Sequence, residues 1–303
     1  MKKIILILCS YLLMMNSVSA EDIMVGTIER EPFVIQTQEG LTGFSIELSQ
    51  KIGERLGLEL NYKKYDVFEE MLSDVENSKT DFAIANISIT SSREKVMDFS
   101  HSIFNGGITL MTKDVSQRQL MLYIVSITNI IVALFVLLFY IIGIQFLGKK
   151  SINKKNIVLT SILIYCILSV YFFTLYRIGL HNKIQIKDGN IVSGVVGVIE
   201  KSTSEDYMIA HNSKYINVKT LSELYFALEN RMIDGILHDS PVLKYYTKNN
   251  EGYSLEYDIL KKEKYGIVFP EKSLLKEKVN LALLELKANG EYEKLYNKYF
   301  GEY

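Results

Sequence analysis

The chain has no tryptophan, three prolines, two cysteines and four histidines among its 303 residues. Cys9 and Cys166 each lie inside an apolar run, so the other segments cannot form a disulfide and must rely on their own core. No two histidines are spaced to share a metal, so we expect no metal site. No Ser/His/Asp order and no paired carboxylates stand out either. We therefore expect a protein without a cofactor that is not an enzyme.

An excess of positive charge is also missing. Lys and Arg number 34 against 35 Asp and Glu, for a net charge of −1. A nucleic-acid surface needs concentrated Lys and Arg to neutralise phosphates, so we expect no nucleic-acid partner. The mean hydropathy is +0.11 although 23% of the residues are charged, which indicates that the apolar residues are concentrated in a few runs.

The first apolar run lies at the N-terminus. Lys2 and Lys3 precede it, and small residues end it at Val18-Ser19-Ala20. This layout is typical of a secretory signal peptide over residues 1–20, and the run is short for a bilayer span. An uncleaved anchor is the alternative. A lipid attachment at Cys9 is disfavoured because the preceding residue, Leu8, is bulky.

Two further runs predict a transmembrane hairpin over residues 114–180. Residues 120–147 carry no charge, and a second uncharged stretch at residues 157–177 is closed by Arg177. At about 1.5 Å per residue each is long enough to span a bilayer. The loop at residues 148–156 contains four lysines, which places it on the cytoplasmic side. We therefore expect an inner-membrane protein whose remaining segments are extracytoplasmic.

Those remaining segments alternate short apolar strands with amphipathic helices, which predicts mostly parallel sheets covered by helices. The expected strands are 23–26, 58–62, 82–85, 107–111, 194–199, 234–237 and 265–269. The expected helices are 44–56, 67–76, one beginning near 203, 222–230, and two within 273–299. One such block precedes the hairpin and one follows it, so we expect an α/β protein of two lobes.

Four motifs, in the same order, resemble the amino-acid-binding family of periplasmic solute-binding proteins. They are GFSIEL from Gly43, DFAIANISITSSRE from Asp81, DGILHDSP from Asp234, and YGIVFP from Tyr265. The third is similar to the glutamine-binding members. The resemblance implies a type II periplasmic-binding-protein clamshell, with residues 21–113 in lobe one, 181–264 in lobe two, and 265–303 returning to lobe one. The same fold forms the ligand-binding core of ionotropic glutamate receptors.

The resemblance also implies a ligand, a free L-amino acid, and residues that bind its two charged groups. Arg93 matches the residue that holds the carboxylate, and its planar fork can donate two parallel hydrogen bonds. Ser88 would add a hydroxyl and a backbone N–H. Asp239 would accept the ammonium, together with the carbonyl of Asn86. Both charges must be satisfied, because an unpaired buried ion is very costly.

Further residues are expected around the ligand. Thr203 and Ser204 stand where a strand gives way to a helix, so their hydroxyls and the amides of the helix start could bind carboxylate oxygens. Phe68 matches an aromatic that covers the ligand side chain. His238 and Arg30 are expected in the side-chain pocket.

Each of these residues has an alternative role. Arg93 beside Glu94 is compatible with a surface ion pair. Asp239 ahead of Pro241 fits a helix N-cap, and Thr203 fits a cap equally well. Phe68 fits a place in the core, and His238 fits the end of a strand.

The hairpin interrupts the clamshell where ionotropic glutamate receptors carry their channel. We expect closure of the lobes to change the separation or angle of the two points at which the ectodomain joins the two membrane spans. This movement would signal to a pore, to further copies of the chain or to a membrane partner. The loop at 148–156 is too short for the pore loop that selects ions in such receptors. The alternative is a membrane-tethered binding component of an ABC amino-acid transporter. An enzyme of the same fold is a third hypothesis, and no catalytic set supports it.

Overall fold

The structure is a computed structural model, and it describes residues 21–114, 184–187 and 190–301, together with short helical pieces between 127 and 173. The predicted signal peptide lies outside the described residues. So does most of the predicted hairpin, including the whole lysine loop.

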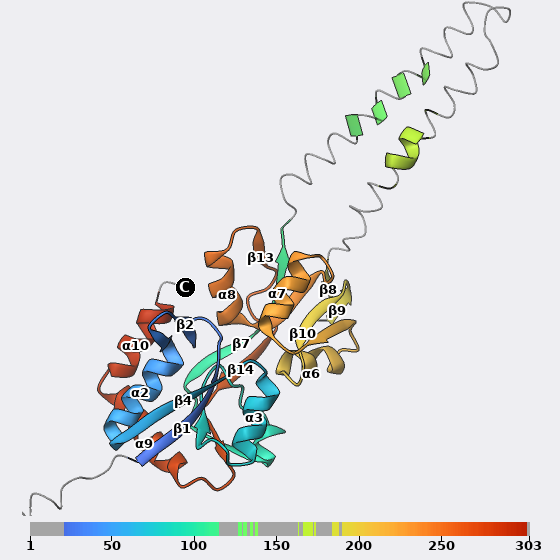
Figure 1. Cartoon of the computed structure of the whole chain (residues 1–303). Helices are drawn as coiled ribbons and strands as arrows, with labels where there is room; N and C mark the ends of the chain where they lie inside the picture. The colour runs from blue at the N-terminus through green and yellow to red at the C-terminus, as the bar shows by residue number, and fades with distance from the viewer. Residues whose placement is uncertain are drawn as a thin grey trace, which may run out of the picture.

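The first of two main sheets forms the core of lobe one (Figure 1). Its strand order is β4-β1-β5-β15-β6. The bounds are β1 Glu21–Ile28, β4 Leu58–Tyr65, β5 Phe82–Ala83, β6 Met97–Phe99 and β15 Val268–Pro270. β1 pairs in parallel with β4 and β5, whereas β15 is antiparallel to β5 and β6. The chain therefore returns to lobe one to supply one strand from its C-terminal part.

Helices cover both faces of this sheet. They are α2 Phe44–Leu56, α3 Phe68–Glu76, α9 Leu275–Ala288 and α10 Glu291–Phe300, with the 3-10 turn η1 at Arg93–Lys95 and the hairpin of β2 Ile35–Thr37 with β3 Gly40–Thr42. α2 has the predicted bounds, because its apolar residues recur on one helical face and Gly57 ends it in the left-handed conformation.

The second main sheet forms lobe two. Its order is β11-β10-β12-β7-β13, and β14 also pairs with β7. The bounds are β7 Phe104–Lys113, β10 Val196–Ile199, β11 Tyr215–Val218, β12 Gly235–Asp239, β13 Tyr253–Leu255 and β14 Lys261–Tyr265. The helices are α6 Thr203–Ala210, α7 Leu221–Glu229 and α8 Ser240–Asn249, and a hairpin joins β8 Gln185–Lys187 to β9 Asn190–Ser193.

β7 and β14 connect the lobes as an antiparallel pair (Figure 1). Gly106 and Gly107 lie in this pair because neighbouring atoms leave no room for a side chain. A Cβ on Gly106 would lie 2.7 Å from the ring of Tyr265, and one on Gly107 would lie 2.3 Å from the carbonyl oxygen of Lys261. The two glycines thus allow the strands that form the hinge to pack closely.

An aromatic cluster holds the C-terminal helices on lobe one. The ring of Phe33 lies 5.1 Å from that of Phe104 on β7 and 5.2 Å from that of Phe300 on α10. Phe44 on α2 lies 5.3 Å from Phe300. Each such pair contributes about 0.5–1.5 kcal/mol beyond its buried area. Residues near both ends of the described chain therefore share one core.

The structure corrects several predictions about the elements. The expected strand at 265–269 is two strands, because the chain passes from β14 to β15 at Gly266 and Ile267. The sheets are mixed, since every pairing of β7 and β15 is antiparallel. α8 and the short strands β2, β3, β6, β8, β9, β11 and β13 were not predicted.

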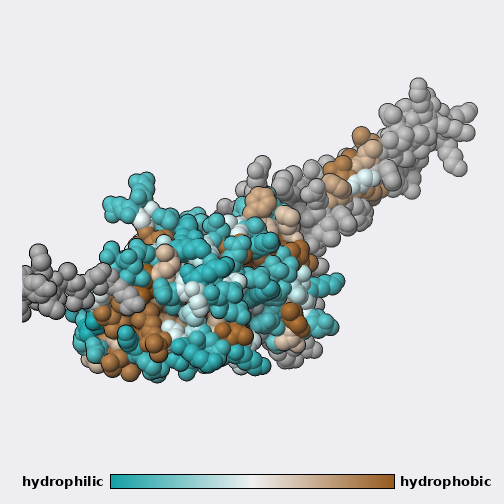
Figure 2. All heavy atoms as spheres, turned by 60° about the horizontal axis from the view of Figure 1, so that its bottom comes forward, coloured by the Kyte–Doolittle hydropathy of each residue, from teal (hydrophilic) through white to brown (hydrophobic). Residues whose placement is uncertain are grey.

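Among the described residues, no helix combines the length and the apolar character needed to cross a bilayer. The spans predicted at 120–147 and 157–177 fall mainly on residues outside the description. The described residues within them are helical, and their large apolar side chains are exposed and coloured brown in Figure 2. Those exposed residues are Ile131, Leu134, Phe135, Leu138, Leu163, Val170 and Phe173.

Both described strands next to the predicted hairpin belong to lobe two. β7 ends at Lys113 after it has paired with β12 and β13, and Ile184 and Ile186 pack on the core of lobe two. Residues 108–113, which were expected in lobe one, pair in the sheet of lobe two, so β7 crosses between the lobes before the predicted hairpin begins. Both described segments that flank the predicted hairpin therefore lie in lobe two.

Candidate functional site

A narrow cavity of about 20 Å³ lies between the two lobes. Its wall contains all nine residues expected to bind a ligand, together with Ile199 and Ser202. The nine are Arg30, Phe68, Asn86, Ser88, Arg93, Thr203, Ser204, His238 and Asp239. Lobe one supplies the first five, and lobe two supplies the other four. Their segments are far apart in the chain, so the fold alone brings them together.

Arg93 begins the turn η1 and extends along the floor of the cleft. Its Nη1 donates to the carbonyl of Ser88 at 2.9 Å, and its Nη2 donates across the cleft to the carbonyl of Lys201 at 3.3 Å. The guanidinium lies 5.0 Å from the ring centre of Phe68, a cation–π contact. Burial lowers the pKa of Arg93, while the negative charge of Asp239 opposes that shift. The guanidinium remains charged at neutral pH.

Asp239 stands at the end of β12, where α8 begins. Its side chain is buried, and the amide of Asn86 donates a hydrogen bond to it from lobe one. Burial and the nearby charge of Glu263 together raise the pKa of Asp239 to about 7, against the opposing effects of a hydrogen bond with Tyr265 and the charge of Arg30. The carboxyl group is therefore poised to ionise when a cation arrives. Asn86 was expected to contact the ligand through its backbone carbonyl. Its side-chain amide is already used in the hydrogen bond to Asp239.

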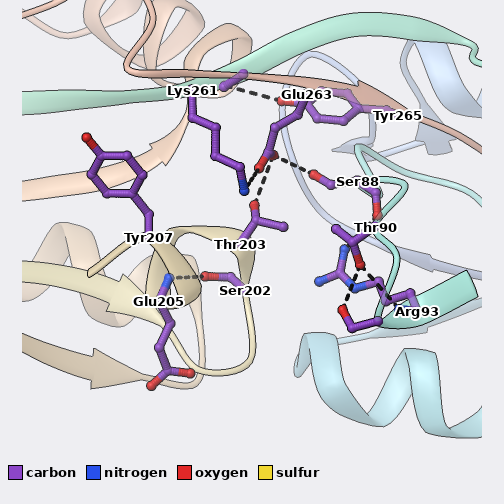
Figure 3. Close-up of polar contacts among 12 residues, drawn as sticks. Ser88, Thr90, Arg93, Ser202, Thr203, Glu205, Tyr207, Lys261, Glu263 and Tyr265 are labelled. Carbon is purple, nitrogen blue, oxygen red and sulfur yellow. Dashed lines mark hydrogen bonds and ion pairs between the residues drawn. The ribbon is translucent and has the colours of Figure 1, made fainter. Parts of the chain in front are cut away.

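Glu263 was not predicted, although it joins the two lobes. It lies on β14, its side chain is 4% exposed, and Lys261 forms an ion pair with it at 3.0 Å. The hydroxyl of Ser88 donates to its carboxylate at 2.7 Å from lobe one, and that of Thr203 donates at 2.9 Å from lobe two (Figure 3). Glu263 thus holds two hydroxyls that were expected to bind the ligand carboxylate.

The sequence around Glu263 explains why it was overlooked. The segment KKEKY has four charged residues in a row, which is typical of a solvated surface. In the structure it is a strand whose third and fifth residues, Glu263 and Tyr265, are buried. The alternation of side chains along a strand would have placed these two on the same face.

The alternative roles of three predicted residues can now be compared with their contacts. The side chain of Asp239 makes no capping hydrogen bond to α8. Ser202 is the cap of α6, because its hydroxyl accepts from the N–H of Glu205 at 3.3 Å, so Thr203 is not the cap. Arg93 contacts carbonyl groups in the cleft, as described above.

The remaining predicted residues close one end of the cavity. Phe68 begins α3 and packs against the apolar clusters of both lobes. His238 is buried, and its Nε2 has no hydrogen-bond partner. Burial and the charge of Arg30 lower the pKa of His238 well below its ordinary value, so the ring is neutral at pH 7. Ser204 is buried in the wall beside Thr203.

The cavity brings two opposite charges together. A guanidinium from lobe one and a carboxyl group from lobe two line one cavity, and hydroxyl groups lie between them. In the described part of the chain, no three His, Cys, Asp or Glu side chains are grouped to hold a metal ion.

Comparisons with known proteins agree with this architecture. The ligand-binding core of GluR0 from Nostoc punctiforme, solved in complex with L-glutamate, is 26% identical, with a TM-score of 0.64 over 92% of this chain and 99% of that one. The amino-acid-binding protein AabA of Dichelobacter nodosus is 38% identical over 80 residues, which cover 26% of this chain and 32% of AabA. The ABC transporter glutamine-binding protein GlnH of Bacillus subtilis is 22% identical over 86% of this chain and 74% of GlnH.

The two lobes, the hinge of β7 and β14, and the cavity between the lobes are those of the periplasmic-binding-protein fold, which confirms the expected clamshell. The model of the bacterial extracellular solute-binding proteins, family 3, matches residues 23–302, and this chain belongs to that family.

Proposed function

We propose that the chain is an extracytoplasmic receptor that closes its two lobes on a free amino acid. The observation that carries this proposal is the meeting of Arg93 and Asp239 on one cavity. An amino acid presents a carboxylate and an ammonium on the same carbon, and each needs an opposite charge once water is excluded. The relatives bear on the same point, because GluR0 was solved with an amino acid and GlnH and AabA are named for binding one.

Arg93 would bind the carboxylate and Asp239 the ammonium. The fork of Arg93 is held by two carbonyl acceptors and by the ring of Phe68, so little side-chain freedom is lost on binding. An ammonium next to Asp239 would favour its ionised form and so lower its pKa from about 7. Each ligand charge would then have a partner from a different lobe, which makes the closed form the one that the ligand prefers.

Glu263 would compete for the same hydroxyls as the ligand carboxylate. Ser88 and Thr203 donate to Glu263, and each hydroxyl has one proton to give. A ligand carboxylate held by Arg93 would have to take over one of these donors or bind through nearby backbone N–H groups. We propose that Glu263 stabilises the closed lobes and that the ligand replaces part of this contact.

We further propose that residues 114–180 form the membrane hairpin and that lobe two carries it. The exposed apolar side chains of the described helical residues in both predicted spans support this. Because Lys113 and Ile184 both adjoin lobe two, closure would move the hairpin as a unit relative to lobe one. A signal then requires that lobe one be held, by further copies of the chain or by a membrane partner.

A membrane-tethered component of an ABC amino-acid transporter is the second candidate. It is supported by the match to GlnH, which spans 86% of this chain. Loss of amino-acid uptake on deletion of the gene would favour it. Ligand-dependent ion flux through liposomes that contain the purified chain would favour the receptor with a channel.

Binding itself is tested by thermal-shift measurements on the full chain in detergent, with each of the common L-amino acids in turn. A ligand that binds the folded form raises the unfolding temperature. Arg93→Ala should lose about 2–5 kcal/mol of binding free energy, because it leaves the ligand carboxylate buried without its partner.

Arg55→Ala is the matched control, since Arg55 forms ion pairs with Glu285 and Glu291 on lobe one and does not line the cavity. If no amino acid stabilises the wild-type protein, the proposed function is wrong. If the shift survives Arg93→Ala unchanged, the role of Arg93 is wrong.

A further inference from the structure

A second guanidinium, that of Arg30, lies in the wall of the same cavity. Arg30 follows β1, and its backbone is fixed by hydrogen bonds with Val34. Only 5% of the residue is exposed. Arg30 also lines a wider hollow of about 470 Å³ between the lobes, so it lies between that hollow and the ligand cavity.

Arg30 has fewer partners than a buried guanidinium needs. Its Nη1 donates to the carbonyl of Glu29 at 2.9 Å. No carboxylate in the described part of the chain forms an ion pair with its side chain. A guanidinium has five N–H donors in a fixed fork, and a buried charge without a counter-ion is costly. Asp239 is the main charge that favours the Arg30 cation, and it is also the partner proposed for the ligand ammonium. Because Arg30 lines the cavity, its remaining donors are available to an anion bound there.

A neutral polar atom lies in the wall of the same cavity. The Nε2 of His238 is buried there without a hydrogen-bond partner, and His238 is adjacent to Asp239 in β12. Buried polar groups are nearly always hydrogen-bonded in native proteins. Arg30 and His238, one on each lobe, thus line the same cavity, and one bound group can satisfy the unused donors of Arg30 and the Nε2 of His238.

The charges of the cavity point to the kind of group. Its wall carries two guanidiniums, Arg30 and Arg93, against one carboxyl group, Asp239. Glu263 is already paired with Lys261. An amino acid with a neutral side chain uses Arg93 and Asp239 and leaves Arg30 unpaired. A basic amino acid adds a second buried positive charge, whereas an acidic one brings the cavity to neutrality.

We propose that the ligand is an acidic amino acid, of the glutamate or aspartate class, and that Arg30 binds its side-chain carboxylate with His238 beside it. This inference rests on the proposed function and adds the substrate class. Arg30 is then the residue that rejects basic amino acids, because two like charges in one dry cavity repel each other strongly.

The test is a set of calorimetric titrations of the full chain in detergent with L-glutamate, L-aspartate, L-glutamine, L-asparagine and L-arginine. For the wild-type protein, one acidic amino acid should bind at least about 100-fold tighter than its own amide, because only the acid forms a buried charge pair with Arg30. L-Arginine should not compete with the acidic amino acid for the site. Wild-type preference for an amide or for arginine would overturn the inference and leave the proposed function standing. Failure of every amino acid to bind would overturn both.

Arg30→Met then tests the residue. It keeps the length of the side chain and removes the charge, so affinity for the acidic ligand should fall about 100-fold, and affinity for the amide should change by less than about tenfold. Arg55→Met, outside the cavity, should change neither. An acidic preference that survives Arg30→Met would show that Arg30 is a structural counter-ion only. If Arg30→Met does not fold, Arg30→Lys serves instead, because it keeps the charge but not the fork and should lose at least about tenfold for the acidic ligand.

Discussion

Asp239 titrates close to neutral pH, and the expected consequence is a ligand affinity that falls as the solution is acidified. Burial and the charge of Glu263 raise its pKa to about 7 in the ligand-free protein. The proposed ammonium contact needs the ionised carboxylate, so protonation competes with binding. The ionised fraction falls about fivefold between pH 7 and pH 6 and about tenfold between pH 6 and pH 5, and a tenfold fall costs about 1.4 kcal/mol of binding free energy.

Isothermal titration calorimetry measures this directly. The dissociation constant should rise about 50-fold from pH 7 to pH 5, and titrations in two buffers of different protonation enthalpy should show release of about half a proton per ligand at pH 7. Asp239→Asn should bind weakly and without this pH dependence. An affinity that is flat over the range, or proton uptake on binding, would refute the role given to Asp239.

The same shift predicts the pH dependence of stability. The folded pKa of about 7 lies above the ordinary value of 3.8, so the folded protein binds more protons than the unfolded chain between these values. The contribution of Asp239 to stability is therefore present at low pH and is lost as the pH rises through 7. The free energy of unfolding of the wild type, minus that of Asp239→Asn, should fall by about 4 kcal/mol between pH 4 and pH 8.

Three further substitutions test other parts of the structure. Glu263→Gln removes a charge that raises the pKa of Asp239, so the midpoint of ligand binding should move to a lower pH. A midpoint that stays or moves to a higher pH in calorimetry would contradict the effect of Glu263 on Asp239. Gly106→Ala places a Cβ 2.7 Å from the ring of Tyr265. Because overpacking destabilises a protein, denaturant titrations should show a free energy of unfolding that is lower by about 1–3 kcal/mol. An unchanged free energy of unfolding would mean that the hinge strands adjust freely. Thr220→Ala removes the capping box of α7 and should lower the free energy of unfolding by about 0.5–2 kcal/mol. Ligand affinity should not change, because Thr220 does not line the ligand cavity. A change in affinity would show that α7 takes part in binding.

Much of the fold could be predicted where one local pattern dominates. The bounds of α2 follow from its apolar spacing and from Gly57. The signals failed where tertiary contacts override the local pattern. Residues 265–269 look like one apolar strand, but Tyr265 ends β14 and Val268 begins β15, and the two strands pair in different sheets. α8 begins with Ser240 and Pro241 and has a polar sequence, so its helical form depends on packing against lobe two.

The candidate site shows the same division. Its nine expected residues were assigned by resemblance to a family, and they line one cavity. Glu263 and the free side of Arg30 could not be found in this way. A glutamate between lysines looks exposed until a strand buries it, and an arginine has unused donors only once its surroundings are known.

Residue types and their spacing were enough to predict the longer strands and helices, the apolar runs, and the kinds of charge available to the cavity. The tertiary structure decided which charges meet, how deeply they are buried, and which lobe carries the segments next to the predicted hairpin. A pKa such as that of Asp239 depends on solvent being excluded from every side and on charges from segments far apart in the chain. Those quantities arise only when the two lobes come together.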